Sequence, residues 1–275
     1  MGILTFIVIK PKRSQKISNA IKDIKMQIAL SLSGGGLRAA AQVGALKFLE
    51  EEGVKIRAVA GSSAGAMLAV MIASGKDAEQ IYAFLKKIVN KDLFRLSKKP
   101  GLFSLKNLEK KLSEELGMER YDQMSIPLYT CVTDINTGES HYLNFGHPIT
   151  NVIASASLTP IFEAKEVEGK WYADGGFSDN LPVKPLKTLG YKVLAIDVNP
   201  IVGSTPRNFK SLLVRSLLIM LQANVKPSKE MADAYLDIKG VARMHLFDFK
   251  KIDTAYEAGY REIKARWSDL REKLV

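Results

Sequence analysis

Blocks of apolar residues recur along the chain at spacings that predict strands and helices in turn. Residues 27–33 alternate apolar and polar positions and then meet three glycines, which predicts a buried strand running into a tight turn. Residues 38–52 are rich in Ala, Leu and Glu and stop at Gly53, as is typical of a helix with a glycine cap. A strand over 55–60 and a helix over 64–74 follow. This order predicts parallel strands joined by crossover helices.

The rest of the chain continues in the same way. Further helices are predicted over 77–90, 105–116, 149–157, 209–222 and 252–273. Further strands are predicted over 126–133 and 141–145, which read as a hairpin, and over 192–198. We therefore expect an α/β fold with a mostly parallel central sheet flanked by helices. In such folds the functional site lies at the edge where the parallel strands end.

Composition limits the classes of protein that this chain can belong to. The 275 residues are 47% hydrophobic and 25% charged, which suits a globular domain of ordinary size. The net charge of +11 favours contact with anions, but no basic run interleaved with aromatics is typical of a nucleic-acid groove. One cysteine excludes an intrachain disulfide, and no stretch approaches the ~20 apolar residues of a bilayer span. We expect a cytoplasmic protein with peripheral contact at an anionic membrane.

Three segments are candidates for contact with a membrane. Residues 1–25 carry six Lys and Arg against one acid, and we expect a basic N-terminal extension ahead of a single domain over 26–275. A frayed terminus is the alternative. The apolar pair Leu102 and Phe103 stands close to Lys98 and Lys99 in the sequence, which suits an anionic interface. The run 217–221 could form an interfacial lid, although its helical spacing favours core packing.

Residues 61–65 read Gly-Ser-Ser-Ala-Gly and fit the pattern G-x-S-x-G, centred on Ser63. The pattern suits a nucleophile because only small neighbours let a strand turn sharply into a helix and lift the hydroxyl clear of the sheet. The turn also points the N-terminus of the helix at developing negative charge. An apolar strand precedes the motif and a helix rich in Ala, Met and Leu follows it. The alternative is a packing turn with an inert serine.

Residues 34–36 are three glycines that follow the first strand and open a helix. Consecutive glycines can turn several N–H groups toward one point, which favours an oxyanion, and Arg38 adds positive charge nearby. The predicted oxyanion hole comprises Gly34, Gly35, Gly36 and Arg38. The same run fits a dinucleotide fingerprint ending at Ala39. That fingerprint requires an acid at the end of the second strand, where this chain has Ser63 instead.

A serine hydroxyl is a poor nucleophile until a base takes its proton. Asp174 begins the run Asp-Gly-Gly, which presents a carboxylate on a tight turn, although Asp-Gly alone indicates only a turn. His245 offers an alternative, because with Asp197 it would complete the chain order Ser, Asp, His of an α/β-hydrolase. The combination of Ser63 with the glycine run favours Asp174 as the base.

Taken together, these motifs resemble those of the patatin-like phospholipase family. The motifs are Gly34-Gly-Gly-Leu-Arg38, Gly61-Ser-Ser-Ala-Gly65, Ala154-Ser-Ala-Ser-Leu-Thr-Pro160, Asp174-Gly-Gly176 and Asn180-Leu-Pro182. The resemblance covers about residues 27–200. Two positions depart from the family pattern: Ala39 stands where a glycine is usual, and Gln42 stands where a histidine is common. Neither departure touches Ser63 or Asp174.

The resemblance implies a patatin-like three-layer architecture and a catalytic pair of Ser63 and Asp174 without histidine. It also implies that the N–H groups of Gly35 and Gly36 hold the oxyanion. The implied reaction is hydrolysis of phospholipids, lysophospholipids or acylglycerols through an acyl-enzyme, with no metal or cofactor and no nucleic-acid partner. Two alternatives stay open: a lipid-binding or regulatory protein with weak activity on the same scaffold, and a transacylase.

Overall fold

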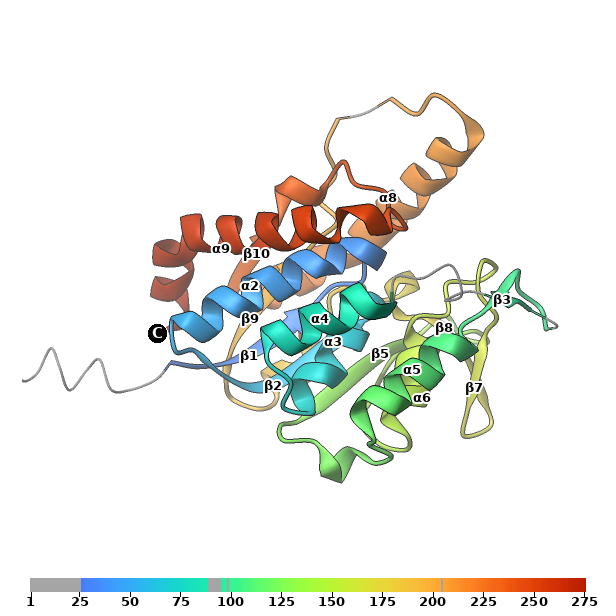
Figure 1. Cartoon of the computed structure of the whole chain (residues 1–275), viewed down its shortest axis with the longest axis horizontal. Coiled ribbons are helices and arrows are strands. Elements are labelled where there is room, and N and C mark those ends of the chain that lie inside the picture. Colours follow the sequence, from blue (N-terminus) through green and yellow to red (C-terminus); the bar gives the residue numbers. More distant parts are fainter. Residues whose placement is uncertain (1–25, 89–94, 98, 204) are drawn as a thin grey trace, which may run out of the picture.

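A computed structural model describes residues 26–88, 95–97, 99–203 and 205–275 of the chain (Figure 1). The strands are β1 (Gln27–Leu32), β2 (Lys55–Ser62), β3 (Arg95–Leu96), β4 (Phe103–Ser104), β5 (Leu128–Asp134), β6 (Ser140–Leu143), β7 (Lys165–Val167), β8 (Lys170–Asp174), β9 (Lys192–Asp197) and β10 (Ala234–Asp237). The α-helices are α2 (Ala40–Glu51), α3 (Ala64–Ala73), α4 (Ala78–Ile88), α5 (Lys106–Leu116), α6 (Pro148–Ser155), α7 (Lys184–Lys187), α8 (Phe209–Met231) and α9 (Ile252–Leu274).

The central sheet is mixed but mostly parallel. Its strands lie in the order β10, β9, β1, β2, β5, β8, β7, and β6 also pairs with β5. The pairs from β10 across to β5 are parallel, whereas β6, β7 and β8 join by antiparallel pairing. β3 and β4 form a separate two-stranded hairpin. The expected fold class is confirmed.

Helices cover both faces of this sheet and make three layers (Figure 1). Alternate residues of β1 point to opposite faces because side chains along a strand alternate. Leu30 belongs to a large core cluster with residues of α2, α3, α4, α6 and α9. Ala29 belongs to a smaller cluster on the other face, with Leu186 of α7 and Val225 of α8. The sheet is therefore buried on both sides, as parallel sheets usually are.

The structure differs from the sequence-based expectations in a few elements. The helix predicted over 209–222 continues to Met231, with Pro227 inside it. The sequence does not predict β3, β4, β7, β8, β10 or α7, each of which is only two to five residues long. The proposed N-terminal extension, residues 1–25, lies outside the described residues, as does Lys98.

Candidate active site

Ser63 occupies a strained turn between β2 and α3. Its backbone has φ 51° and ψ −123°, a left-handed conformation that residues other than glycine rarely adopt. The turn is tight because Gly65 lies directly against the end of β1, where a Cβ would overlap the Leu32 carbonyl oxygen. The helix α3 begins at Ala64, so its positive N-terminal end lies beside the Ser63 hydroxyl. This arrangement is the one expected for a nucleophile.

Ser63 and Asp174 meet although 111 positions separate them in sequence. Both come from strands that pair with β5. Along its first half β5 pairs with β2, ending at Ser62 opposite Cys131, and from the next residue, Val132, it pairs with Asp174 of β8. Because β6 occupies the other edge of β5, β2 and β8 share one edge and end against each other. The Ser63 Oγ donates a hydrogen bond of 2.7 Å to Asp174 Oδ2.

The Asp174 carboxylate is 3% exposed and has two hydrogen-bond donors. Its Oδ1 accepts from the Gly176 N–H at 2.8 Å, while Oδ2 accepts from Ser63. Burial raises the pKa of Asp174 from 3.8 to about 6, against the opposite effect of these two hydrogen bonds. The higher pKa makes this carboxylate a better proton acceptor than an exposed aspartate while leaving it ionised at neutral pH.

In the glycine run, two backbone N–H groups lie at the pocket without a hydrogen-bond acceptor among the described residues. The Gly34 N–H donates to the Asn180 carbonyl at 3.2 Å, so it has a partner within the protein. In the part of the chain that the structure describes, the N–H groups of Gly35 and Gly36 donate to no protein group. Both residues line the pocket that also holds Ser63 and Asp174. The available donors are therefore at Gly35 and Gly36, and the inclusion of Gly34 in the predicted oxyanion hole is not supported.

Arg38 has a different place from the one expected. Its guanidinium donates to the carbonyl oxygens of Met244, at 2.7 and 2.9 Å, and of Ala242, at 3.1 Å. Burial lowers its pKa to about 10, partly offset by the charge of Asp197. The side chain thus ties the turn before α2 to the segment before α9 and lines neither of the pockets that Ser63 lines. We correct the prediction that places it in the oxyanion hole.

The alternative triad is not assembled. The carboxylate of Asp197 accepts from the Asn199 N–H, Gln222 Nε2 and the Tyr235 hydroxyl. Within the described residues, no hydrogen bond links His245 to Asp197 or to Ser63. His245 lies instead in a neighbouring hollow beside α8.

Ser155 supports the backbone of Ser63, a role that the sequence did not predict. Its Oγ accepts from the Ser63 N–H at 2.8 Å and donates to the Cys131 carbonyl at 2.5 Å. Two residues on, the Ser157 carbonyl accepts from the Asp174 N–H at 2.9 Å. The available signal was the run 154–160, noted only as a family resemblance. One short segment thus contacts the backbones of both Ser63 and Asp174.

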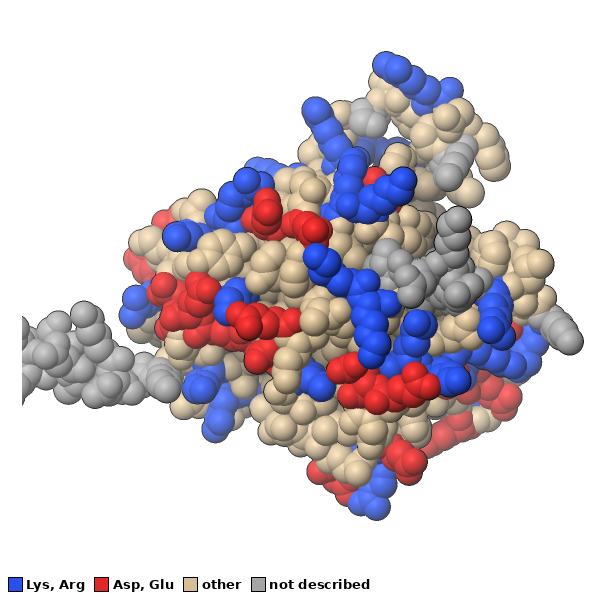
Figure 2. Space-filling view, in the orientation of Figure 1, with Lys and Arg blue, Asp and Glu red and all other residues tan. Residues whose placement is uncertain are grey.

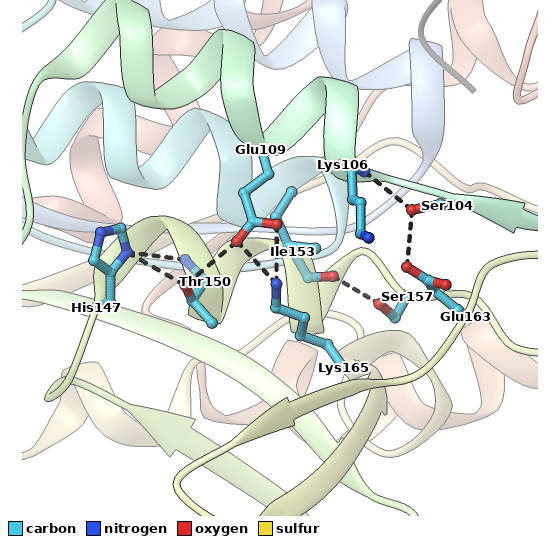
Figure 3. A network of polar contacts seen from close by, with 9 residues as sticks. All are labelled: Ser104, Lys106, Glu109, His147, Thr150, Ile153, Ser157, Glu163 and Lys165. Atoms are coloured by element: carbon cyan, nitrogen blue, oxygen red, sulfur yellow. Dashed lines mark hydrogen bonds and ion pairs between the residues drawn. The ribbon is translucent and has the colours of Figure 1, made fainter. Parts of the chain in front are cut away.

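A polar network fixes that segment to its neighbours (Figure 3). The two carboxylate oxygens of Glu109, on α5, each lie 2.9 Å from Lys165 Nζ at the start of β7, and one also accepts from Thr150 of α6 at 3.4 Å. Within the segment, the Ser157 hydroxyl donates to the Ile153 carbonyl at 2.8 Å. The network therefore joins α5, α6 and β7.

The side chains of Asn199 and Gln42 donate hydrogen bonds to the glycine run and to the residue before it. Asn199 Nδ2 donates to the Gly34 carbonyl at 2.5 Å. Gln42 Nε2 donates to the carbonyls of Ser33, at 3.0 Å, and Ile196, at 3.1 Å, and so bridges the ends of β1 and β9. Gln42 therefore has a structural role at the position where the family pattern often has histidine.

An apolar cavity leads away from Ser63. Including its opening to solvent, it has an empty volume of about 760 Å³. The side chains around it come from α3, α4, α5 and the start of α9, including Met67, Leu85, Ile88, Leu108 and Ile252, and from Phe162 in the connection between α6 and β7. A second, smaller hollow holds Ser63, Asp174 and Asn180. The site thus places a few polar groups beside a cavity lined by apolar side chains.

Asn180 is the polar side chain in this hollow that sequence reasoning left without a role. It is 1% exposed, and neither of its amide atoms has a hydrogen-bond partner among the described residues. A Cβ built on Gly34 would lie 2.7 Å from Asn180 Oδ1 and 2.8 Å from Ser63 Cβ, so the amide lies close to the nucleophile. A buried amide without a protein partner is uncommon.

Comparison with known proteins identifies the family. The family profile described as "Patatin-like phospholipase" matches residues 30–187, which is more than half of the chain. The matched region includes the glycine run, Ser63 and Asp174. The chain belongs to the patatin-like phospholipase family.

Relatives agree with this assignment. Lysophospholipase nte1 of Emericella nidulans is 30% identical over 190 residues, covering 66% of this chain and 12% of the relative. An uncharacterized NTE family protein of Mycobacterium tuberculosis is 28% identical over 164 residues, covering 58% of this chain and 45% of the relative. The chain therefore spans less than half the length of these relatives. The crystal structure of VipD from Legionella pneumophila has the same fold, with a TM-score of 0.52 and 15% identity over 88% of this chain and 67% of VipD.

No helix in the described part of the chain has both the length and the apolar character needed to cross a bilayer. No group of three or more His, Cys, Asp or Glu side chains there is arranged to hold a metal ion.

Proposed function

We propose that this protein is a lipid acyl hydrolase that cleaves phospholipid or lysophospholipid esters through a covalent acyl-enzyme on Ser63. The observation that carries the proposal is the 2.7 Å hydrogen bond from the Ser63 hydroxyl to the buried Asp174 carboxylate, beside two open N–H groups. Membership of the patatin-like phospholipase family supports the same reaction class.

The reaction follows from the positions of these groups. Ser63 Oγ attacks the ester carbonyl carbon, and its proton passes to Asp174 Oδ2. The negative charge on the tetrahedral oxygen is held by the N–H groups of Gly35 and Gly36 and by the N-terminus of α3. When the intermediate collapses, the C–O bond breaks and the leaving alcohol takes the proton from Asp174. Water then attacks the acyl-enzyme by the same route and releases the fatty acid.

The apolar cavity next to Ser63 is suited to the acyl chain of the substrate. Each methylene moved from water into such a site contributes about 0.8 kcal/mol. Met67 and Ile88 line the cavity beyond Ser63, and Leu108 lies on the wall formed by α5. We expect chain-length preference to depend on these side chains.

Asn180 is proposed to bind the ester group of the substrate. Its amide is buried beside Ser63 and has no protein partner, so a substrate oxygen is the group that can satisfy it. Asn180→Ala should lower kcat/KM by about tenfold to a hundredfold, the effect of losing one hydrogen bond to a reacting group. Unchanged kinetics would remove Asn180 from the mechanism.

Product analysis tests the proposed function. Wild type, Ser63→Ala and Ser62→Ala are incubated with lysophosphatidylcholine and with a diacyl phosphatidylcholine, and released fatty acid is quantified. Ser62 is a matched control because it is the neighbouring serine of the same motif, is fully buried, and its hydroxyl has no partner among the described residues. We expect turnover by wild type and Ser62→Ala and none by Ser63→Ala. Equal activity in all three proteins, or none in any, would contradict the proposal.

A further inference from the structure

The helix α8 is apolar on two opposite sides. One side faces the protein: Leu218 and Leu221 are buried, and Leu221 lines the hollow that contains Ser63 and Asp174. The other side faces solvent, where Phe209 is 80% exposed and Leu213 is 56% exposed. Leu212, Ile219 and Met220 are also exposed. A single-sided amphipathic helix would bury all of its large apolar residues, so the outer side of α8 is unexplained by the fold.

Two further apolar elements lie near the hollow that contains Ser63 and Asp174. The β3–β4 hairpin exposes Leu96 and Leu102, and its strand β4 is bound to the backbone at Ile161 and bridged to Phe162, which lines this hollow. Phe247 is 43% exposed, lines the same hollow, and makes an edge-to-face contact with Phe162. In Figure 1 the hairpin and the first turns of α8 both lie toward the right-hand end of the molecule.

Backbone hydrogen bonds at Leu102 and Phe103, together with the side chain of Glu163, anchor the hairpin. Glu163 accepts from the hydroxyl groups of Ser97, at 2.5 Å, and Ser104, at 2.8 Å. Figure 3 shows the contact with Ser104. The exposed leucines therefore belong to an anchored loop, whose apolar surface is a fixed feature of the fold.

The three segments that carry this apolar surface contain no acidic residue. The described parts of these segments are 95–97, 99–108, 198–203, 205–229 and 238–247, and their basic residues include Lys99, Lys106, Arg207, Arg215, Lys239 and Arg243. Figure 2 shows basic side chains around the upper right-hand part, where the first turns of α8 lie, and little acidic surface there. A surface that combines exposed apolar side chains with positive charge is suited to an anionic lipid interface.

We propose that this docking face, formed by the outer side of α8, the β3–β4 hairpin and Phe247, binds the surface of an anionic phospholipid bilayer. The proposal rests on the proposed function, because a lipid hydrolase takes its substrate from a bilayer, and Phe247 and the inner side of α8 line the hollow that contains Ser63. Apolar side chains of the face enter the interface, and a phospholipid reaches Ser63 along the inner side of α8 with little exposure of its acyl chains to water.

Charge argues against the other occupants. In a twofold dimer formed through this face, two basic surfaces would meet and repel each other. The segment 1–25 has six Lys and Arg and one acid, so its charge matches that of the face instead of complementing it. An anionic bilayer is the occupant with complementary charge.

Vesicle sedimentation tests the docking face. The test variant is Phe209→Glu with Leu213→Glu, and the matched control is Phe145→Glu with Val275→Glu, which makes the same charge change at two exposed apolar positions. Phe145 follows β6, which runs antiparallel to β5, and Val275 ends the chain after α9, so neither belongs to the docking face. The probe is vesicles of phosphatidylcholine with and without about 30% phosphatidylglycerol.

We expect wild type and the control to bind the anionic vesicles and the test variant to bind at least about tenfold more weakly. Binding of the wild type should fall when phosphatidylglycerol is omitted or salt is raised. Three outcomes would overturn the proposal: no vesicle binding by wild type, equal binding by the test variant, or a dimer that the test variant dissociates without a change in vesicle binding.

A second readout separates this proposal from the proposed function. Hydrolysis of a water-soluble short-chain ester needs no interface, so the test variant should retain wild-type turnover on it while losing turnover on vesicles. Ser63→Ala should show the reverse, with vesicle binding kept and ester hydrolysis lost. Vesicle binding without any hydrolysis would leave the docking face intact and contradict only the proposed function. Parallel loss of both ester and vesicle turnover in the test variant would contradict a separate docking role.

Discussion

Burial gives the Asp174 carboxylate a pKa within the range where activity can be followed. If ionised Asp174 is the base, kcat/KM for a soluble ester should fall with a slope of one below pH about 6. A pH–rate profile between pH 4 and 8 measures this limb, with Ser62→Ala as the control that keeps it. Activity that stays constant down to pH 4 would contradict the assignment.

Because its carboxylate is buried, ionisation of Asp174 lowers the free energy of unfolding. Its pKa is raised from 3.8 to about 6 in the folded protein, so the native state binds more protons than the unfolded state between these values. Stability therefore decreases as pH rises through this window. We expect Asp174→Asn to increase the free energy of unfolding at pH 7.5 by about 1–2 kcal/mol, since the amide carries no charge but also loses part of the hydrogen bonding.

Urea unfolding at several pH values checks this prediction. The advantage of Asp174→Asn should shrink as pH falls from about 6 to 4 and be absent below the unfolded-state pKa. A variant less stable than wild type at pH 7.5 would show that hydrogen bonding outweighs burial at this site.

Ser155 should matter for both fold and rate. In Ser155→Ala the Ser63 N–H loses its acceptor and the Cys131 carbonyl loses a donor. We expect a loss of about 1–3 kcal/mol in unfolding free energy and about a tenfold lower kcat, because the strained turn that aims the hydroxyl is no longer held. Ser155→Thr can keep both hydrogen bonds and should restore part of the rate.

The two candidate site residues and the contact between them could be predicted, but the contacts that hold the rest of the site in place could not. Ser63 and Asp174 stand in recognisable local motifs, and the hydrogen bond predicted between them is present. The roles of Ser155 and Arg38 depend on groups far away in sequence, such as Cys131 and Met244, that no local pattern specifies. Arg38 was misplaced because proximity to the glycine run in sequence says nothing about where a long side chain points.

At the scale of elements, α2 and α9 pack unusually closely. Gly259 of α9 lies against the Ala41 carbonyl of α2, where a Cβ would overlap it, and Gly44 of α2 lies in the same way against the Tyr256 carbonyl of α9. We expect Gly259→Ala to cost about 2–4 kcal/mol because the helices must separate. Urea unfolding measures the loss, and Ser268→Ala, at an exposed position of α9, should stay within about 0.5 kcal/mol of wild type. A neutral Gly259→Ala would contradict the close packing.

Most helices and the parallel strands β1, β2, β5 and β9 followed from periodicity, whereas β8 and β10 did not. The run Lys170 to Asp174 is short, charged at its first position and followed by two glycines, so local signals favour a turn. Only pairing with β5 makes it a strand, and that pairing is what brings Asp174 to Ser63. The element that completes the site is therefore the one that local sequence could not specify.

For the whole molecule, we infer that residues 26–275 form a single domain. The family profile ends at residue 187, yet β9 lies between β1 and β10 in the sheet and α9 contributes to the same core cluster as α2. Removing the segment after 187 would expose an interior strand of the sheet, so the C-terminal part is needed to complete the core.

The two tryptophans test this inference because they report on different halves. Trp171 lies in β8, and Trp267 lies buried in α9, where its Nε1 donates to Glu52. The single-tryptophan variants Trp171→Phe and Trp267→Phe should each unfold in one transition, and the variants should coincide after correction for the stability effect of each substitution. Two separated transitions in wild type, each reported by one tryptophan, would indicate two domains.

The identity of the nucleophile is tested most directly by trapping it. A fluorophosphonate probe reacts with an activated serine, and peptide mapping by mass spectrometry identifies the modified side chain. We predict one adduct, on Ser63, with its formation strongly slowed in Asp174→Asn. An adduct on Ser62 or another residue, or labelling of Ser63 at the wild-type rate in Asp174→Asn, would contradict the account.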